Sequence, residues 1–128
     1  MDTLHVLDQW LGECERRGRL DIHGSPQVIA TVSRQEIAAV REAVRRLIDE
    51  RFGKAGEIRL GPALVSVLGA ERARLLIEEA FKEGKIDALS AQLFQIGVDM
   101  TPFVPPTSPL WGFDRLMQAA FGRGLKLM

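Results

Sequence analysis

Apolar residues recur at spacings of three and four along most of the first 98 residues, a pattern typical of amphipathic helices that pack on a common core. The first such stretch runs from Asp2 to Arg17 and is followed by Gly18, a residue type that commonly ends helices. Similar stretches run over residues 34–52, 62–83 and 87–98. We therefore predict a mainly α fold, a compact helical domain of about four to five helices.

The segment between the first two predicted helices has a period of two instead. Leu20 and Ile22 alternate with polar residues, a Gly-Ser-Pro break follows, and a β-branched run then extends to Val32. This pattern predicts a minor β-hairpin over residues 19–32. Because a hairpin alone is marginal in water, we expect it to lie on the helices or to pair further, with residues 57–60 as a short third strand.

The second predicted helix opens with a capping box, in which the side chains of Ser33 and Glu36 each accept the other residue's backbone N–H. The apolar face of this helix consists of Ile37, Val40, Val44, Leu47 and Ile48. In the stretch 62–83, Gly69 either kinks one helix or separates two, and the pattern leaves this open. The residues expected to point inward on the later helices are Leu75, Leu76, Ala80 and Phe81, and then Leu89, Leu93 and Ile96.

The composition restricts the classes of function that the chain can have. Its 128 residues fit one domain of ordinary size, and 17 Lys and Arg balance 17 Asp and Glu to give zero net charge. Proteins that bind nucleic acid mainly by bulk charge carry a basic excess, so the balance argues against that class. One cysteine and two histidines provide neither an internal disulfide nor a structural zinc site.

The sequence contains no recognisable catalytic motif. It has no nucleotide-binding loop, and His5 and His23 are not placed for a Ser–His–Asp arrangement. Cys14 lies on the apolar side of the first predicted helix, which indicates a buried core residue and not a reactive thiol. We therefore expect no enzyme activity, no catalytic residues, no cofactor and no metal.

A Pro-rich C-terminal arm, residues 99–128, follows the predicted helical domain of residues 1–98. Four of the six prolines lie within residues 101–109, which predicts an extended backbone there. The arm is expected to end in a short amphipathic helix over residues 114–121. Four of the eight aromatic residues lie beyond residue 100, so large apolar side chains are concentrated in the arm.

Large apolar side chains in an extended arm cost free energy in water, so we expect them to be buried. The arm either folds back over its own domain or covers a protein partner or a sister subunit. We predict the second: a non-catalytic protein–protein interaction protein (adaptor, regulator or structural subunit) that docks on a protein partner or forms a homo-oligomer. The candidate partner-binding residues are Phe103, Trp111, Phe113, Leu116, Met117 and Phe121.

The alternative is a nucleic-acid-associated regulatory protein that uses an arginine stripe on the helix 34–52. The stripe follows one side of that helix at spacings of seven and four and consists of Arg34, Arg41 and Arg45. Against this alternative, Glu42 and Asp49 occupy an adjoining strip, and Glu42 lies four residues before Arg46, which favours a local ion pair. No Lys or Arg occurs between residues 86 and 114, so nucleic acid is the weaker prediction.

The sequence also argues against a membrane partner. No stretch approaches the ~18–20 uncharged apolar residues that span a bilayer, and the first residues lack the pattern of a signal peptide. Together with the single thiol, this predicts a cytoplasmic protein. A membrane-surface anchor is a further alternative, but the helix there is short and its positive excess is small. Its residues would be Trp111, Phe113, Arg115, Arg123 and Lys126.

Overall fold

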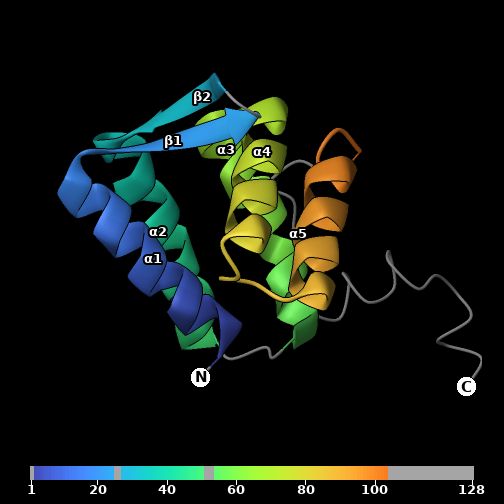
Figure 1. Cartoon of the computed structure of the whole chain (residues 1–128). Helices are drawn as coiled ribbons and strands as arrows, with labels where there is room; N and C mark the ends of the chain where they lie inside the picture. The colour runs from blue at the N-terminus through green and yellow to red at the C-terminus, as the bar shows by residue number, and fades with distance from the viewer. Residues whose placement is uncertain (1, 25–26, 51–53, 104–128) are drawn as a thin grey trace, which may run out of the picture.

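The structure is a computed structural model that describes residues 2–24, 27–50 and 54–103 (Figure 1). In chain order the elements in these ranges are α1 (Thr3–Arg17), β1 (Arg19–Gly24), β2 (Gln27–Ser33), α2 (Arg34–Glu50), the 3₁₀ helix η1 (Lys54–Arg59), α3 (Leu60–Leu68), α4 (Ala70–Lys82) and α5 (Ala88–Met100). The prediction of a mainly α fold with a minor hairpin is confirmed. Residues 101–103 were predicted to be extended but form a turn, because the Phe103 N–H donates to the Met100 carbonyl oxygen at 2.9 Å at the end of α5. The rest of the arm, residues 104–128, lies outside the described residues.

Two groups of helices form the body of the fold. α1 and α2 lie side by side, α3, α4 and α5 pack together next to them, and the hairpin crosses one end (Figure 1). The core contains buried apolar residues from these five helices and from both strands. Each helix therefore turns an apolar face toward one common core.

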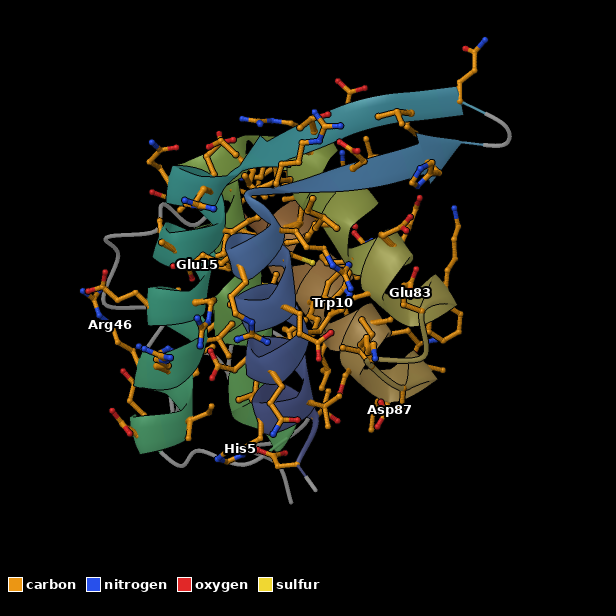
Figure 2. All side chains as sticks on the ribbon, turned by 60° about the vertical axis from the view of Figure 1, so that its left-hand side comes forward. His5, Trp10, Glu15, Arg46, Glu83 and Asp87 are labelled. Carbon is orange, nitrogen blue, oxygen red and sulfur yellow. The ribbon has the colours of Figure 1, made fainter. Side chains whose placement is uncertain are left out.

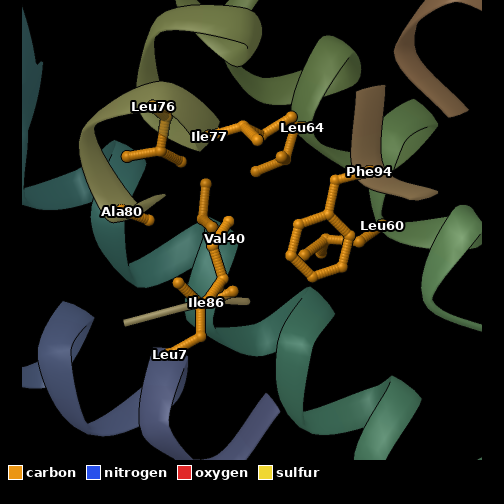
Figure 3. Close-up of a pocket in the computed structure, with 9 residues that line it drawn as sticks. All are labelled: Leu7, Val40, Leu60, Leu64, Leu76, Ile77, Ala80, Ile86 and Phe94. Atoms are coloured by element: carbon orange, nitrogen blue, oxygen red, sulfur yellow. The ribbon is translucent and has the colours of Figure 1, made fainter. Parts of the chain in front are cut away.

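A small cavity at the centre of the core shows how closely the helices pack (Figure 3). Its volume is about 10 Å³, and its lining is entirely apolar: Leu7, Val40, Leu60, Leu64, Leu76, Ile77, Ala80, Ile86 and Phe94. A space of this size holds at most one water molecule, which would need polar partners that the lining does not offer. The centre of the fold is therefore packed core and not a ligand site.

The predicted capping box at the start of α2 is formed. The Glu36 backbone N–H donates to Ser33 Oγ at 3.2 Å, and the Ser33 backbone N–H donates to Glu36 Oε1 at 3.0 Å. Arg72 of α4 adds a bidentate ion pair, with Nη1 and Nη2 at 2.9 and 2.7 Å from the two carboxylate oxygens of Glu36. Hydrogen bonds from Arg72 and from the Ser33 N–H lower the pKa of Glu36 to about 2.

The Arg72–Glu36 pair also occupies backbone groups of β2. Arg72 Nη1 donates to the Thr31 carbonyl oxygen at 3.2 Å, while Glu36 accepts the Ser33 N–H. The strand has no charged residue, and an uncharged strand with free edge groups is open to pairing with other chains. The ion pair therefore joins the hairpin to α2 and α4 and blocks part of this strand.

We expect Glu36→Gln to lower the free energy of unfolding by about 1–2 kcal/mol at neutral pH, because Arg72 loses its charged partner. The folded-state pKa of Glu36 lies below its unfolded value of about 4.5, so the contribution is complete above that pH and is lost as the pH falls toward about 2. The difference in melting temperature between wild type and variant, measured by circular dichroism, should therefore shrink over this range.

Glu42→Gln is the matched control in the same helix. Glu42 pairs with Arg46 at 2.7 Å, as predicted from their spacing, and both side chains are largely exposed. Exposed pairs of this kind contribute little to stability. If Glu42→Gln lowered the melting temperature as much as Glu36→Gln, the assigned role of the Arg72–Glu36 pair would be wrong.

Residues 57–60 do not form the predicted third strand. They lie in η1 and in the first turn of α3, which begins at Leu60. The alternation of Ile58 and Leu60 suggested a strand, but Glu57 is also buried, at 1% exposure, and its Oε2 accepts a hydrogen bond from Ser90 Oγ at 2.7 Å. Burial of neighbouring residues does not fit the two-residue period of a strand, so the pattern was misleading here.

The stretch 62–83 contains two helices. Gly69 separates α3 from α4 and has a φ of 83°, a conformation that favours glycine. The residues that α4 buries are Ala73, Leu76, Ile77, Glu79 and Ala80. Phe81 was predicted to point inward but is 49% exposed. It lies in the last turn of α4, at the border of the buried face, and that face packs against the core through the small residues Ala73 and Ala80.

α5 also buries a different face from the one predicted. Its buried residues are Ser90, Phe94, Gly97 and Val98. Leu89 and Ile96 were expected to point inward and are exposed, whereas Leu93 is half-buried. The helix has large apolar residues on two faces, and periodicity alone selected the wrong one.

The physical reason is a close approach of backbones at two glycines. A Cβ atom added at Gly97 would overlap the carbonyl oxygen of Ile58, and one added at Gly61 would lie 2.6 Å from Gly97 Cα. The face of α5 that contains Gly97 is therefore the face that can pack directly against η1 and α3. The larger apolar side chains are left on the other side of the helix.

Candidate functional site

An exposed apolar stripe runs along the outer side of α5. Its residues on the helix are Leu89, Leu93, Ile96 and Met100, at spacings of four, three and four. Leu89 and Ile96 are 52% and 42% exposed, while Leu93 and Met100 are partly buried against Ile58. Phe103, three residues after Met100, is 85% exposed. We call these five residues, from Leu89 to Phe103, the α5 stripe.

The surface around the α5 stripe is polar and acidic. A hollow of about 360 Å³ on the helix is lined by Ala91, Gln92, Gln95, Ile96 and Asp99. Asp99 pairs with Arg74 at 2.8 Å, and both side chains are largely exposed. At the start of the helix (Figure 2), Asp87 accepts the Ser90 backbone N–H at 2.7 Å. An apolar seam with acidic groups near both ends can bind an apolar segment that carries basic residues.

One of the six predicted partner-binding residues, Phe103, lies within the described residues and extends the α5 stripe. The other five lie outside them: Trp111, Phe113, Leu116, Met117 and Phe121. The stripe on α5 itself was missed, because Leu89, Leu93 and Ile96 were assigned to the core. Its four-three-four spacing, which is typical of helices that dock on other helices, was the available signal.

The arginine stripe of the alternative prediction lies along the contact between α1 and α2. Arg41 Nε donates to Asp8 Oδ1 and its Nη1 donates to Glu15 Oε1, each at 3.0 Å. Arg45 Nε lies 3.4 Å from Asp8 Oδ1, and Arg34 Nε donates to the Glu15 carbonyl oxygen at 3.1 Å. Glu15 faces α2 from the last turns of α1 (Figure 2). All three arginines therefore bind groups of α1.

Arg41 is held most closely of the three. The hydrogen bond that it donates to Asp8 raises the pKa of Arg41, and Glu15 adds to the same effect. The guanidinium passes over Gly12, where an added Cβ atom would come within 3.2 Å of it. A nucleic-acid phosphate would have to displace two carboxylates before it could bind Arg41, and this geometry supports a structural role for the side chain.

Besides Glu57, two ionisable side chains of the described residues are buried, both away from the α5 stripe. Cys14 lies in the core, where burial raises the pKa of its thiol, as expected for a structural and unreactive cysteine. Glu79 is 7% exposed, and its Oε1 has no hydrogen-bond partner among the described residues. Glu79 lines neither the cavity of Figure 3 nor the hollow on α5.

Neither metal ligands nor similarity to known proteins adds a candidate site in the described part of the chain. In the described part of the chain, no group of three or more His, Cys, Asp and Glu side chains is arranged to hold a metal ion. None of the described helices is long and apolar enough to cross a membrane. Comparison of the chain with protein-family models, with curated proteins and with solved structures found no match.

Proposed function

We propose that this chain is a non-catalytic protein–protein interaction protein, an adaptor, regulator or assembly subunit, that docks through the α5 stripe and the arm. The α5 stripe carries this proposal, because Leu89 and Ile96 expose large apolar side chains two turns apart on one side of α5, and Phe103 is exposed just beyond the end of the helix. Apolar side chains that gather on one part of a surface are typical of sites that bind other proteins. Scattered single residues would carry no such meaning.

Two further features support this function. The α5 stripe ends at Phe103, where the segment that contains Trp111 and Phe113 begins, so the apolar surface and the aromatic residues are continuous along the chain. Aromatic side chains are the commonest anchors of protein interfaces, and prolines reduce the entropy that an arm loses on docking. In addition, α5 fills the main core through residues such as Phe94, so the exposed members of the stripe, Leu89 and Ile96, are not needed there.

Affinity purification of the full-length protein from its native host tests this function. We expect the double variant Trp111→Ser, Phe113→Ser to lose proteins that the wild type retains, because it removes two predicted anchors. Its melting temperature, measured at a concentration where the protein is monomeric, should stay unchanged, because side chains that dock on a partner add nothing to the core of the monomer. The control Val28→Ser changes an exposed apolar residue of the hairpin and should retain the same proteins as the wild type.

Three results would contradict the proposal. The first is an identical set of retained proteins for wild type and double variant. The second is a large fall in the melting temperature of the double variant, which would place Trp111 and Phe113 on their own domain. The third is salt-sensitive binding to duplex or single-stranded nucleic acid that Arg45→Gln weakens, which would favour the arginine stripe instead.

A further inference from the structure

We infer that the α5 stripe binds residues 104–128 of a second copy of this chain, so that two copies exchange these segments. The inference rests on the proposed function and names the partner. In a two-fold dimer each copy would supply one segment and one stripe, and the two contacts would be identical. Such an arrangement would bury the apolar residues of both the stripe and the arm.

The α5 stripe has the spacing of a surface that receives another helix. From Leu89 to Met100 its four helical residues follow one another at intervals of four, three and four, which is the spacing of the a and d positions of a heptad, and Phe103 follows in the turn after the helix. Within the described residues, Ile58 covers one side of the stripe through Leu93 and Met100. The exposed side, with Leu89 and Ile96, is left for a partner.

The sequence of residues 104–128 fits this surface in shape and apolar content. Residues 114–121 are predicted to form an amphipathic helix, with Leu116, Met117, Ala120 and Phe121 on its apolar side. Trp111 and Phe113 come just before it and provide two large anchors. A short helix with an apolar seam is the natural complement of another helix with one.

The charges of the two surfaces are also complementary. Residues 104–128 contain Arg115, Arg123 and Lys126 against the single acidic residue Asp114, a net charge of 3 − 1 = +2. Residues 86–103 contain Asp87 and Asp99 and no Lys or Arg, a net charge of −2, and a basic group of the segment would have to share Asp99 with the largely exposed Arg74 of α4. Opposite charges at the edges of an apolar contact favour encounter and fix its orientation.

The length of the proline-rich link favours a second copy over the chain's own stripe. Residues 101–103 form a turn at the end of α5, and residues 104–109, which contain three prolines, span about 19 Å if extended at ~3.1 Å per residue. The 13 residues of α5 span about 20 Å. If the link ran back along α5, it would place the predicted helix 114–121 beyond Leu89, at the far end of its own stripe. If the link ran away from α5, the predicted helix would not reach its own stripe.

The area that a stable dimer needs points the same way. Stable interfaces bury about 800 Å² on each partner. One face of the 13-residue α5, about 20 Å long and ~10 Å wide and partly covered by Ile58, is too small to reach this area by pairing stripe with stripe. Exchange of the segments adds 25 residues from each copy (128 − 103 = 25) and forms two contacts at once. After the first contact forms, the second is intramolecular and is strengthened by a high effective concentration.

Light scattering coupled to size-exclusion chromatography of the full-length protein over a concentration series tests the inference. We expect a dimer whose dissociation constant rises by at least about tenfold in Ile96→Glu and in the double variant Trp111→Ser, Phe113→Ser. Ile96 is 42% exposed, so a glutamate there reaches water and the fold should survive. Val28→Glu, at an equally exposed site on the hairpin, should leave the dimer intact.

Mixing the two weakened variants gives the decisive measurement. The Ile96→Glu protein keeps residues 104–128 intact, and the double variant keeps the α5 stripe intact. In a mixed dimer the intact segment of the first can therefore bind the intact stripe of the second, which restores one of the two contacts. We therefore expect a one-to-one mixture to associate more strongly than either variant alone. Docking of the segment on the stripe of its own copy would instead leave the wild type monomeric across the concentration series.

Three outcomes would overturn the inference, and they separate it from the proposed function. A monomeric wild type whose double variant melts at a lower temperature would mean that each segment covers its own stripe. A monomeric wild type whose double variant loses host proteins would preserve the proposed function and remove the second copy as partner. A dimer that neither Ile96→Glu nor the double variant weakens would place the interface elsewhere.

Discussion

Gly97→Ala is expected to destabilise the fold by about 3 kcal/mol or more, at the upper end of the range for overpacked cores. The added Cβ atom would overlap the Ile58 carbonyl oxygen and lie 3.1 Å from Gly61 Cα. Both neighbours are backbone, so no side chain can move aside, and α5 would have to separate from η1 and α3. In an exposed helix the same change stabilises by about 0.5–1 kcal/mol, so the expected sign is opposite to helix propensity. Urea unfolding followed by circular dichroism measures the difference.

Gly12→Ala is the matched control, because Gly12 is also a buried helical glycine. The atoms nearest to its added Cβ belong to the Arg41 guanidinium, at 3.2–3.3 Å, and this flexible group can shift by a few tenths of an ångström. We expect its stability to stay within about 1 kcal/mol of the wild type. A Gly97→Ala protein as stable as Gly12→Ala would show that α5 does not pack on η1 as closely as described.

Local signals in the sequence were sufficient to predict most of the helices. Ser33 and Glu36 lie within one helical turn, so their capping box depends on neighbouring residues alone and formed as predicted. The end of α1 at Gly18 is similar, since a glycine with a φ of 95° closes that helix through its own backbone. Elements whose ends are fixed by nearby residues can be predicted from one sequence.

The inward faces of α4 and α5 depend on contacts between distant residues. Gly61 and Gly97 come into contact only after both helices have formed, and the residues that flank either glycine in the sequence give no sign of this contact. The burial of Glu57 depends in the same way on Ser90, which lies 33 residues later. Periodicity shows that a helix has an apolar face, but it does not show which of two faces packs more closely.

The candidate site was predicted only in part, because it too depends on contacts between residues that are distant in the sequence. Phe103 was identified because it stands in a proline-rich segment where a core position is not expected, and the structure exposes it. The stripe on α5 was missed because its apolar residues matched the pattern of a core helix. The arginine stripe was judged against Glu42 and Asp49, whereas the residues that bind it, Asp8 and Glu15, are 33 and 26 residues from Arg41.

Val44→Asp is expected to unfold the protein at neutral pH. Val44 is 0% exposed and lies on the buried face of α2 with Ile37 and Val40. An unpaired carboxylate there costs several kcal/mol, which is comparable with the total stability of about 5–15 kcal/mol of a typical domain. Loss of the cooperative melting transition, followed by circular dichroism, is the expected observation.

The same helix contains the controls that separate charge from shape. Val44→Thr keeps the shape, and its hydroxyl can bond to a carbonyl one turn earlier, so we expect a folded protein with a lower melting temperature. Leu47→Asp, by contrast, places the carboxylate at a partly buried site in a groove of about 290 Å³ between α2 and α3 that Arg46 and Arg59 also line. Because that carboxylate reaches water in the groove, Leu47→Asp should cost less than Val44→Asp. If Leu47→Asp proved the more damaging of the two, the buried face assigned to α2 would be wrong.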